Sequence, residues 1–340
     1  MLRYGRQESG TISRFPFSDA EPPTMTSLPN RLNAYEQLLR LYQPSGAFLL
    51  LWPILSALWL TTSGWPPISL VIIFVMGTLL MRSAGCALTD WLDRHNHLRG
   101  SSGGDGVPHH VDTRAAPPKK SISAQGVIAP WEALAVAAVL ALAAFGFIWF
   151  TAPVAINLSV GALALALVLA LLQHRLKRVL SLPHAAFALV FLFGIPMTFA
   201  TANHPVSWFA WSLLGIHVFW ILACDIESAM ANRDEDAAFG WRSSALLLGR
   251  YDVLAVAICY GLFLAGMALV GHWWHLGVTF WIALALAAAG MLFFLWFIRR
   301  RKPSRCATAF RHQQWIVMVI FLGIAADYTL RLHAMPMLGR

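Results

Sequence analysis

The chain has 340 residues, of which 58% are hydrophobic and only 12% are charged. Soluble domains carry about twice that charged share, so a soluble enzyme is excluded, and four cysteines without CxxC spacing indicate neither a zinc site nor a redox pair. The formal net charge of +9 would suit either nucleic acid or acidic lipid, and the placement of the charges along the chain decides between them.

The first 44 residues are the most polar part of the chain. Residues 1–30 contain Pro22-Pro23 and no apolar core of the signal-peptide type, so we expect a disordered cytoplasmic extension. Residues 31–44 have the pattern of an amphipathic helix that lies on the cytoplasmic surface.

The rest of the chain is dominated by long apolar segments. A membrane-spanning helix needs about 20 mostly apolar residues. Nine segments approach this length: 46–62, 68–89, 129–150, 154–172, 183–203, 207–230, 252–271, 274–298 and 314–332. The sequence therefore predicts an all-α integral membrane protein, a bundle of nine transmembrane helices within residues 31–333. Residues 97–128 form a long cytoplasmic loop in this prediction.

The basic residues divide the connections into two kinds. Four short turns, at Pro66, Pro153, Pro205 and Gly271, contain no Lys or Arg. By contrast, 23 of the 25 basic residues precede the first span, lie in the alternate loops or, in the case of Arg82, lie in the last part of the second span, which leads into such a loop. Loops rich in Lys and Arg stay in the cytoplasm. We therefore expect a cytoplasmic N-terminus and contact with membrane lipid, and we attribute the positive charge to topology, with no nucleic acid as partner.

Acidic residues gather in two stretches on the predicted cytoplasmic side. Nine of the sixteen lie there: Asp90, Asp93, Asp105 and Asp112 in the first, and Asp225, Glu227, Asp234, Glu235 and Asp236 in the second. Mg²⁺ prefers oxygen ligands, commonly one or two carboxylates plus substrate phosphates, and nearby Lys and Arg bind the remaining phosphate charge. Two matched clusters four spans apart favour a magnesium–diphosphate site over solvated loop acids. They also suggest two four-helix pseudo-repeats plus one helix.

Several motifs together resemble the UbiA superfamily of intramembrane prenyltransferases over about residues 31–330. They are Arg31–Arg40 (RLNAYEQLLR), Leu49–Pro53, Met81–Cys86 (MRSAGC), Phe193–Met197, and Asp234–Asp236 with Gly240, Ser243 and Ala245. The resemblance implies that Mg²⁺ holds a polyprenyl diphosphate between the acidic motifs, with the isoprenoid tail in a lipid-facing tunnel. It further implies transfer of the polyprenyl group to the ring carbon ortho to the hydroxyl of 4-hydroxybenzoate, in ubiquinone biosynthesis. The expected location is a bacterial inner membrane, or the mitochondrial inner membrane in a eukaryote.

The resemblance also implies roles for individual residues. The catalytic carboxylates would be Asp90, Asp93, Asp225 and Asp236. The magnesium ligands would be Asp90, Asp93, Asn232 and Asp236, with Asp105 and Asp234 as further candidates. The diphosphate or the acceptor carboxylate would bind Arg82, Arg94, Lys120, Lys177 and Arg178.

Four positions depart from the family patterns NDxxDxxxD and DTxYAMxDRDDD, namely Thr89, His97, Ser228 and Asn232. Asn232 still offers a neutral oxygen, but His97 is a poor Mg²⁺ ligand. In the lengthened loop, Asp105 is our candidate for the missing carboxylate. These departures leave open a catalytically weakened member, or one with another acceptor such as a naphthoate or a porphyrin. A transporter is disfavoured, because nearly all charges lie in loops or at helix ends and not near the bilayer midplane.

Overall fold

The computed structural model describes residues 28–40, 45–102, 128–149, 155–162, 189–202, 206–238 and 242–334, with positions 164, 165 and 168. Within these ranges the side chains of residues 28–30, 45, 92–102, 130 and 332–334 are not described. Every regular element in the described part of the chain is helical, as the apolar periodicity predicts.

The described part of the N-terminal half contains five labelled helices. They are α1 (Leu28–Leu38), α2 (Ser45–Thr61), α3 (Ile68–Ser102), α4 (Pro130–Trp149) and α7 (Gly194–Thr201). Helical residues 189–192 lead into α7, and residues 155–162 are also helical. In this half α3 packs against α4, and α2 packs against both α3 and α7.

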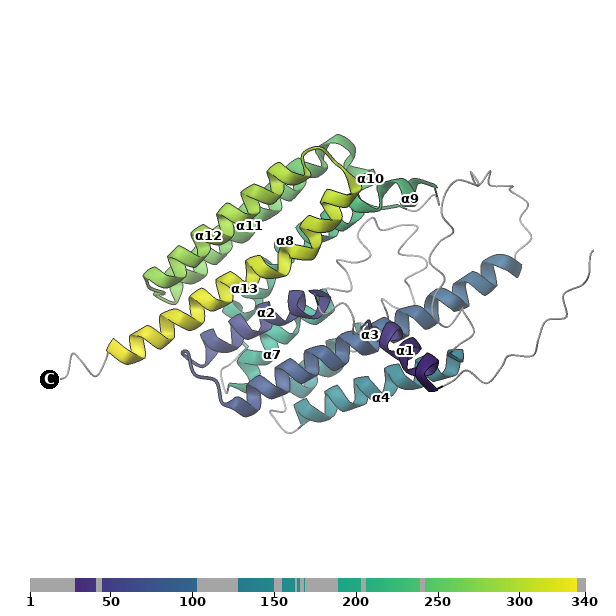
Figure 1. Ribbon diagram of the computed structural model, residues 1–340. Coiled ribbons are helices and arrows are strands. Elements are labelled where there is room, and N and C mark those ends of the chain that lie inside the picture. The colour runs from purple at the N-terminus through teal and green to yellow at the C-terminus, as the bar shows by residue number, and fades with distance from the viewer. Residues whose placement is uncertain are drawn as a thin grey trace, which may run out of the picture.

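The C-terminal half is a bundle of long helices with short ones between them. It comprises α8 (Trp208–Ala231), α9 (Arg233–Ala238), α10 (Ser244–Leu248), the 3₁₀ turn η2 (Gly249–Tyr251), α11 (Asp252–Trp273), α12 (Val278–Ile298) and α13 (Pro303–Ala334). The last helix, α13, lies along α12 and also packs on α8 and α2, so it joins the two halves of the molecule (Figure 1).

Six of the described helices are long and apolar enough to cross a membrane, and two shorter apolar helices cover Gly46–Thr61 and Leu189–Thr201. Their outward faces carry large apolar side chains; Ile282 and Leu286 of α12, for example, are 55% and 62% exposed. Exposed apolar surface of this kind suits contact with lipid. The chain is a multi-pass membrane protein, with eight of the nineteen residues of the predicted fourth span outside the described residues.

Three helices have different ends from those that hydropathy predicts. The helix α3 continues past residue 89 to Ser102, into residues 97–102 that the sequence assigns to a loop, and α13 begins at Pro303, eleven residues before the predicted span. The helix α12 begins at Val278 and not at 274, because His275 adopts a positive φ of 50° and ends the preceding turn. Hydropathy detects only the apolar part of a helix. Charged residues such as Arg305 lower the hydropathy of the remaining helical turns, which are therefore not predicted as part of the span.

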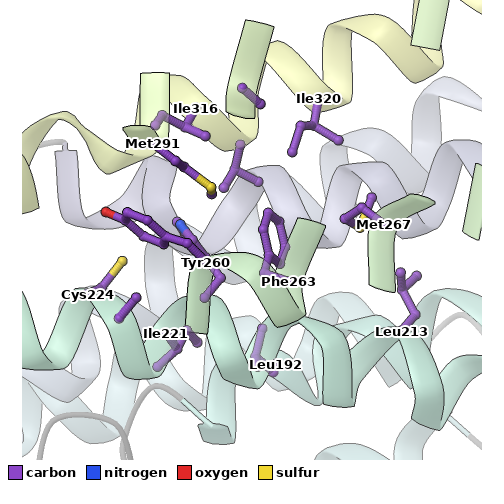
Figure 2. Packing of buried hydrophobic residues seen from close by; sticks show 14 of the residues in the cluster. Leu192, Leu213, Ile221, Cys224, Tyr260, Phe263, Met267, Met291, Ile316 and Ile320 are labelled. Atoms are coloured by element: carbon purple, nitrogen blue, oxygen red, sulfur yellow. The ribbon is translucent and has the colours of Figure 1, made fainter. Parts of the chain in front are cut away.

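The largest core cluster lies where α8, α11 and α13 meet. Figure 2 shows Phe263 and Met267 of α11 between Leu213 of α8 and Ile320 of α13, and all four side chains are fully or almost fully buried. A second cluster joins α2 to α13 through Leu55 and Phe321 and to residues of the N-terminal half. These clusters fix the long helices relative to one another, and thereby fix the points between which the short elements run.

The connections alternate between the two ends of the bundle (Figure 1). The basic connection 299–302 lies at the same end as α9 and α10, whereas the turns at 62–67 and 274–277 lie at the other end. At that second end Gly64 has φ +105° and its Cα faces Tyr328 of α13, where an added Cβ would come within 2.3 Å. Both the backbone angle and the close approach require glycine there.

Candidate functional site

An apolar cavity of about 280 Å³ lies between α2, α3, α4, the helical residues around 160, and the segment that leads into α7. Small side chains on two facing helices leave this space open, with Gly77 and Ala84 on α3 opposite Ala137 and Ala141 on α4. Nothing lies within 4 Å of a Cβ built on Gly77, so this glycine faces the open space. The cavity therefore suits a hydrocarbon chain.

The first acidic motif lies where this cavity meets α3. Thr89 lines the cavity, and its hydroxyl donates to the Cys86 carbonyl oxygen at 2.9 Å. Asp90 follows it on the same helix and is half-buried. Two turns earlier, the Arg82 guanidinium lies against Gly46 at the start of α2, where an added Cβ would come within 2.7 Å of Nη2. The apolar cavity thus reaches Thr89, the residue directly before a predicted metal ligand.

The second acidic motif covers the end of α8 and the whole of α9. Asp225 is 5% exposed, and its Oδ2 accepts a hydrogen bond from the Ser244 hydroxyl of α10 at 3.0 Å. Asn232 ends α8, and its carbonyl oxygen accepts from the Asp236 backbone N–H at 2.9 Å, so Asn232 also begins α9. Residues four apart share a helix face, which places Asn232 and Asp236 together. Asn232 and Asp234 are exposed, and Asp236 is half-buried.

Glu227 is not the loop acid that the sequence suggests. It is fully buried in α8 and accepts hydrogen bonds from the Tyr260 hydroxyl of α11 and from Gln313 Nε2 of α13, with both Nε2–Oε distances at 3.1 Å. Asp225 and Glu227 are two positions apart and therefore face different neighbours. The end of α8 is consequently held to α10 on one side and to α11 and α13 on the other.

The predicted site residues are only partly described. The side chains of Asp93, Arg94 and His97 are outside the described set, and so are residues Asp105, Lys120, Lys177 and Arg178. Among the described side chains, no three His, Cys, Asp or Glu residues lie close enough to share a metal ion. The two acidic segments nevertheless point to the same end of the molecule, where α9 and the C-terminal part of α3 lie (Figure 1).

Several site residues carry no local sequence signal. Tyr260 and Gln313 have no motif around them, and Ser244 lies between the motif residues Ser243 and Ala245 without being one of them. Each of the three contacts an acidic residue between 19 and 86 positions away. The run of small residues on α3 and α4 is a signal for the cavity, because Gly and Ala at helical spacing leave room beside a helix. Nothing comparable marks the polar partners of α8.

Comparison with known proteins places the chain. The model of the UbiA prenyltransferase family matches residues 50–322. A protein of Ralstonia nicotianae named 4-hydroxybenzoate octaprenyltransferase is 42% identical over 90% of this chain and 99% of its own length. One of the same name from Cupriavidus necator is 42% identical over 88% of this chain and 99% of its own length.

Solved structures agree on the fold. A UbiA homologue from Aeropyrum pernix K1, without ligand, superposes with a TM-score of 0.63 at 18% identity and covers 82% of this chain and 97% of its own. One from Archaeoglobus fulgidus, bound to GPP and Mg²⁺, gives 0.60 at 12% identity over 86% and 99%. With a family match over most of its length, close relatives of equal extent and this helical fold, the chain belongs to the UbiA prenyltransferase family.

Proposed function

We propose that this protein transfers a polyprenyl group from polyprenyl diphosphate to the ring carbon ortho to the hydroxyl of 4-hydroxybenzoate, a step of ubiquinone biosynthesis. The apolar cavity that reaches Thr89, one residue before Asp90, is the structural observation that carries this proposal. It offers a place for the hydrocarbon tail directly beside the carboxylates expected to bind the diphosphate. The relatives at 42% identity support 4-hydroxybenzoate as the acceptor.

The chemistry of the acidic segments fits a magnesium ion. Their described members offer carboxylate and amide oxygens, which Mg²⁺ prefers over nitrogen and sulfur. We assign the ligands to Asp90 and Asp93 of the first segment and to Asn232 and Asp236 of the second, with Asp105 and Asp234 as further candidates. When bound, the ion would neutralise charge on the departing diphosphate. The Archaeoglobus homologue with GPP and Mg²⁺ supports this assignment.

The basic residues would balance the negative charge of the diphosphate, which carboxylates cannot do. Arg82 lies two turns before Asp90 on α3 and is assigned to the diphosphate, together with Arg94, Lys120, Lys177 and Arg178. Guanidinium groups suit phosphate and carboxylate alike, because their donors form a planar fork. One of these residues would therefore hold the carboxylate of the acceptor.

The reaction then follows from what these groups hold in place. The bond between the first prenyl carbon and the diphosphate oxygen breaks, and its electron pair leaves with the diphosphate. The ring carbon ortho to the phenol hydroxyl forms the new carbon–carbon bond and loses its proton. Apolar walls around the prenyl chain keep water away from the electron-poor carbon, and buried Asp225, held by Ser244, keeps a carboxylate in a fixed place at the end of α8.

The orientation in the membrane belongs to the same proposal. The basic connection 299–302 lies at the end that carries α9, and basic loops stay in the cytoplasm. We therefore place the acidic segments and the N-terminus on the cytoplasmic side of a bacterial inner membrane, in a nine-helix bundle of two pseudo-repeats plus one helix. Bacterial relatives support this location.

In a second candidate function, the protein has the same fold but uses another acceptor or catalyses the transfer only weakly. It is favoured by Thr89, whose hydroxyl is bonded to its own helix, and by Asn232, a neutral ligand where the family pattern has Asp. A naphthoate or a porphyrin would then replace 4-hydroxybenzoate, with the same diphosphate site.

Membranes that contain the protein test both candidates. We expect prenylated product from 4-hydroxybenzoate and polyprenyl diphosphate with Mg²⁺, and none with EDTA. Asp90→Asn should lower the rate by at least about 10²-fold, the factor typical of one electrostatic contact in a dry site. Glu36→Gln, on the exposed face of α1, should leave the rate unchanged. Product with a naphthoate or porphyrin alone would favour the second candidate, and EDTA-resistant transfer would contradict the magnesium assignment.

A further inference from the structure

The helix α9 carries two of the proposed magnesium ligands, yet none of its side chains is packed into the core. It is six residues long, and none of its residues is buried. A short helix without apolar contacts is marginal on its own, because helices of this size depend on tertiary packing. Its position must therefore come from polar contacts.

Arg233, the first residue of α9, makes those contacts. Its Nη2 lies 2.9 Å from the Ala245 carbonyl oxygen and 3.2 Å from that of Gly249, and 2.5 Å from Oδ2 of Asp252. The acceptors belong to α10, to η2 and to the first residue of α11. Arg233 thus ties α9 to α10, η2 and α11.

Asp252 is the centre of this arrangement. It is fully buried, and its carboxylate also accepts from Arg301 Nε, at 2.9 Å to Oδ1 and 3.0 Å to Oδ2. The Val253 backbone N–H donates to Oδ1 at 2.6 Å. A buried carboxylate is stable only when it is paired and hydrogen-bonded. Arg233 and Arg301, which belong to different segments, provide these contacts for the Asp252 carboxylate.

Arg301 lies in the connection between α12 and α13 with φ +51°, in the left-handed region where helices commonly end in glycine. A glycine would fit the backbone more easily but would have no side chain to reach Asp252. Arg301 also donates from Nη2 to the Arg250 carbonyl oxygen at 2.7 Å. Its hydrogen bond to Asp252 raises the pKa of the Arg301 guanidinium above its usual value, so the group stays charged.

We propose that Asp252 and Arg301 are positioning residues that hold α9, through Arg233, in the place where its carboxylates bind magnesium diphosphate. This rests on the proposed magnesium-dependent transfer. We assign neither residue to the substrate or to the metal. They act by fixing one side of the site, and breaking the bridge should therefore weaken magnesium binding more than it slows the bound complex.

Initial rates as a function of Mg²⁺ concentration test this with the purified full-length protein. We expect Asp252→Asn and Arg301→Gln to raise the Mg²⁺ concentration for half-maximal rate about tenfold, a factor that corresponds to about 1.4 kcal/mol. The rate at saturating Mg²⁺ should change much less. Arg301→Lys keeps a charged donor and should recover part of the shift. Arg300→Gln removes a charge from the next, exposed residue and should change nothing.

Hydrogen exchange of the α9 amides gives a readout that needs no activity. In the metal-free protein, exchange in residues 233–238 should be faster in Asp252→Asn and Arg301→Gln than in the unmodified chain and in Arg300→Gln. Unchanged exchange and unchanged Mg²⁺ dependence, with only a lower Tm, would show a merely structural role and overturn the proposal. Should Asp252→Asn fail to fold, the partly exposed Arg301 still provides the test. Absence of transfer by the unmodified chain would count against the proposed function, and the exchange rates would still decide this inference.

Discussion

Single polar side chains inside the C-terminal bundle connect helices that are far apart in the sequence. Gln313 donates to the Glu227 carboxyl group from 86 positions away, in a region without exposed surface. We expect Gln313→Leu to lower the free energy of unfolding by about 1–3 kcal/mol, because a buried acceptor loses a donor that nothing replaces. Thermal unfolding in detergent measures the loss.

The neighbouring Gln314 is a matched control for that substitution. It is also buried, and its Oε1, like that of Gln313, has no partner among the described residues. Because Gln314 makes no hydrogen bond to Glu227 in the described part of the chain, Gln314→Leu should cost little or stabilise the protein. Equal destabilisation by both substitutions would mean that side-chain volume, and not the bond to Glu227, matters at this turn of α13.

At the level of residues, sequence reasoning identifies which side chains carry charge but not which neighbours hold them. The motif predicts Asp225 as a site residue, whereas its partner Ser244 belongs to a different helix, and its place between the motif residues Ser243 and Ala245 does not indicate this contact. Glu227 is grouped with the acids on the cytoplasmic side, because the predicted span 207–230 shows that a helix continues through it but not which helices cover it. Contacts of this kind depend on how α8, α10 and α13 pack, which no local pattern encodes.

Among the elements, α1 shows how two kinds of contact compare. Arg31 Nη2 lies 3.0 Å from each carboxylate oxygen of Glu132 on α4, but the two side chains are 43% and 18% exposed. An exposed ion pair contributes under about 1 kcal/mol, whereas Leu38 is almost fully buried in a cluster with Ala87 of α3. The apolar contact should therefore hold the helix.

Limited proteolysis measures which contact holds α1. Leu38→Asp should speed tryptic cleavage after exposed Arg40 by more than about tenfold, since burying a charge costs far more than 1.4 kcal/mol. Glu132→Ala should change it by less than about fivefold, and Glu36→Ala, on the exposed face of α1, should have no effect. A larger effect of Glu132→Ala than of Leu38→Asp would reverse this ranking.

The helices themselves were predicted well where they are apolar and poorly where they leave the hydrocarbon. The predicted spans 207–230 and 252–271 differ from α8 and α11 by two residues or fewer at each end. By contrast, α3 and α13 run on through charged residues, because backbone hydrogen bonds continue a helix whether or not its side chains are apolar. Hydropathy therefore gives the fold class and the order of the elements, but not the C-terminal end of α3, on which the first acidic segment lies.

At the scale of the whole molecule, the cavity and the end that carries the acidic segments belong to one proposed site. The cavity volume of about 280 Å³ is at the lower limit of ligand pockets, which run from about 300 to 1,000 Å³. A long polyprenyl chain must therefore extend beyond the described walls, whereas a short one fits inside. Gly77 lies twelve residues before Thr89 on α3, or about 18 Å deeper along the helix axis.

Filling the deep part of the cavity should consequently discriminate between donors by length. We expect Gly77→Phe to lower kcat/KM for octaprenyl diphosphate at least about tenfold more than for geranyl diphosphate, because only the longer chain passes the added ring, and a factor of ten corresponds to about 1.4 kcal/mol. Gly261→Phe is the matched control: Gly261 also has nothing within 4 Å of an added Cβ, but it lies on the exposed face of α11, away from the cavity. It should leave both donors unaffected. Equal losses for both donors in Gly77→Phe would place the prenyl chain elsewhere, and the cavity would then no longer support the proposed function.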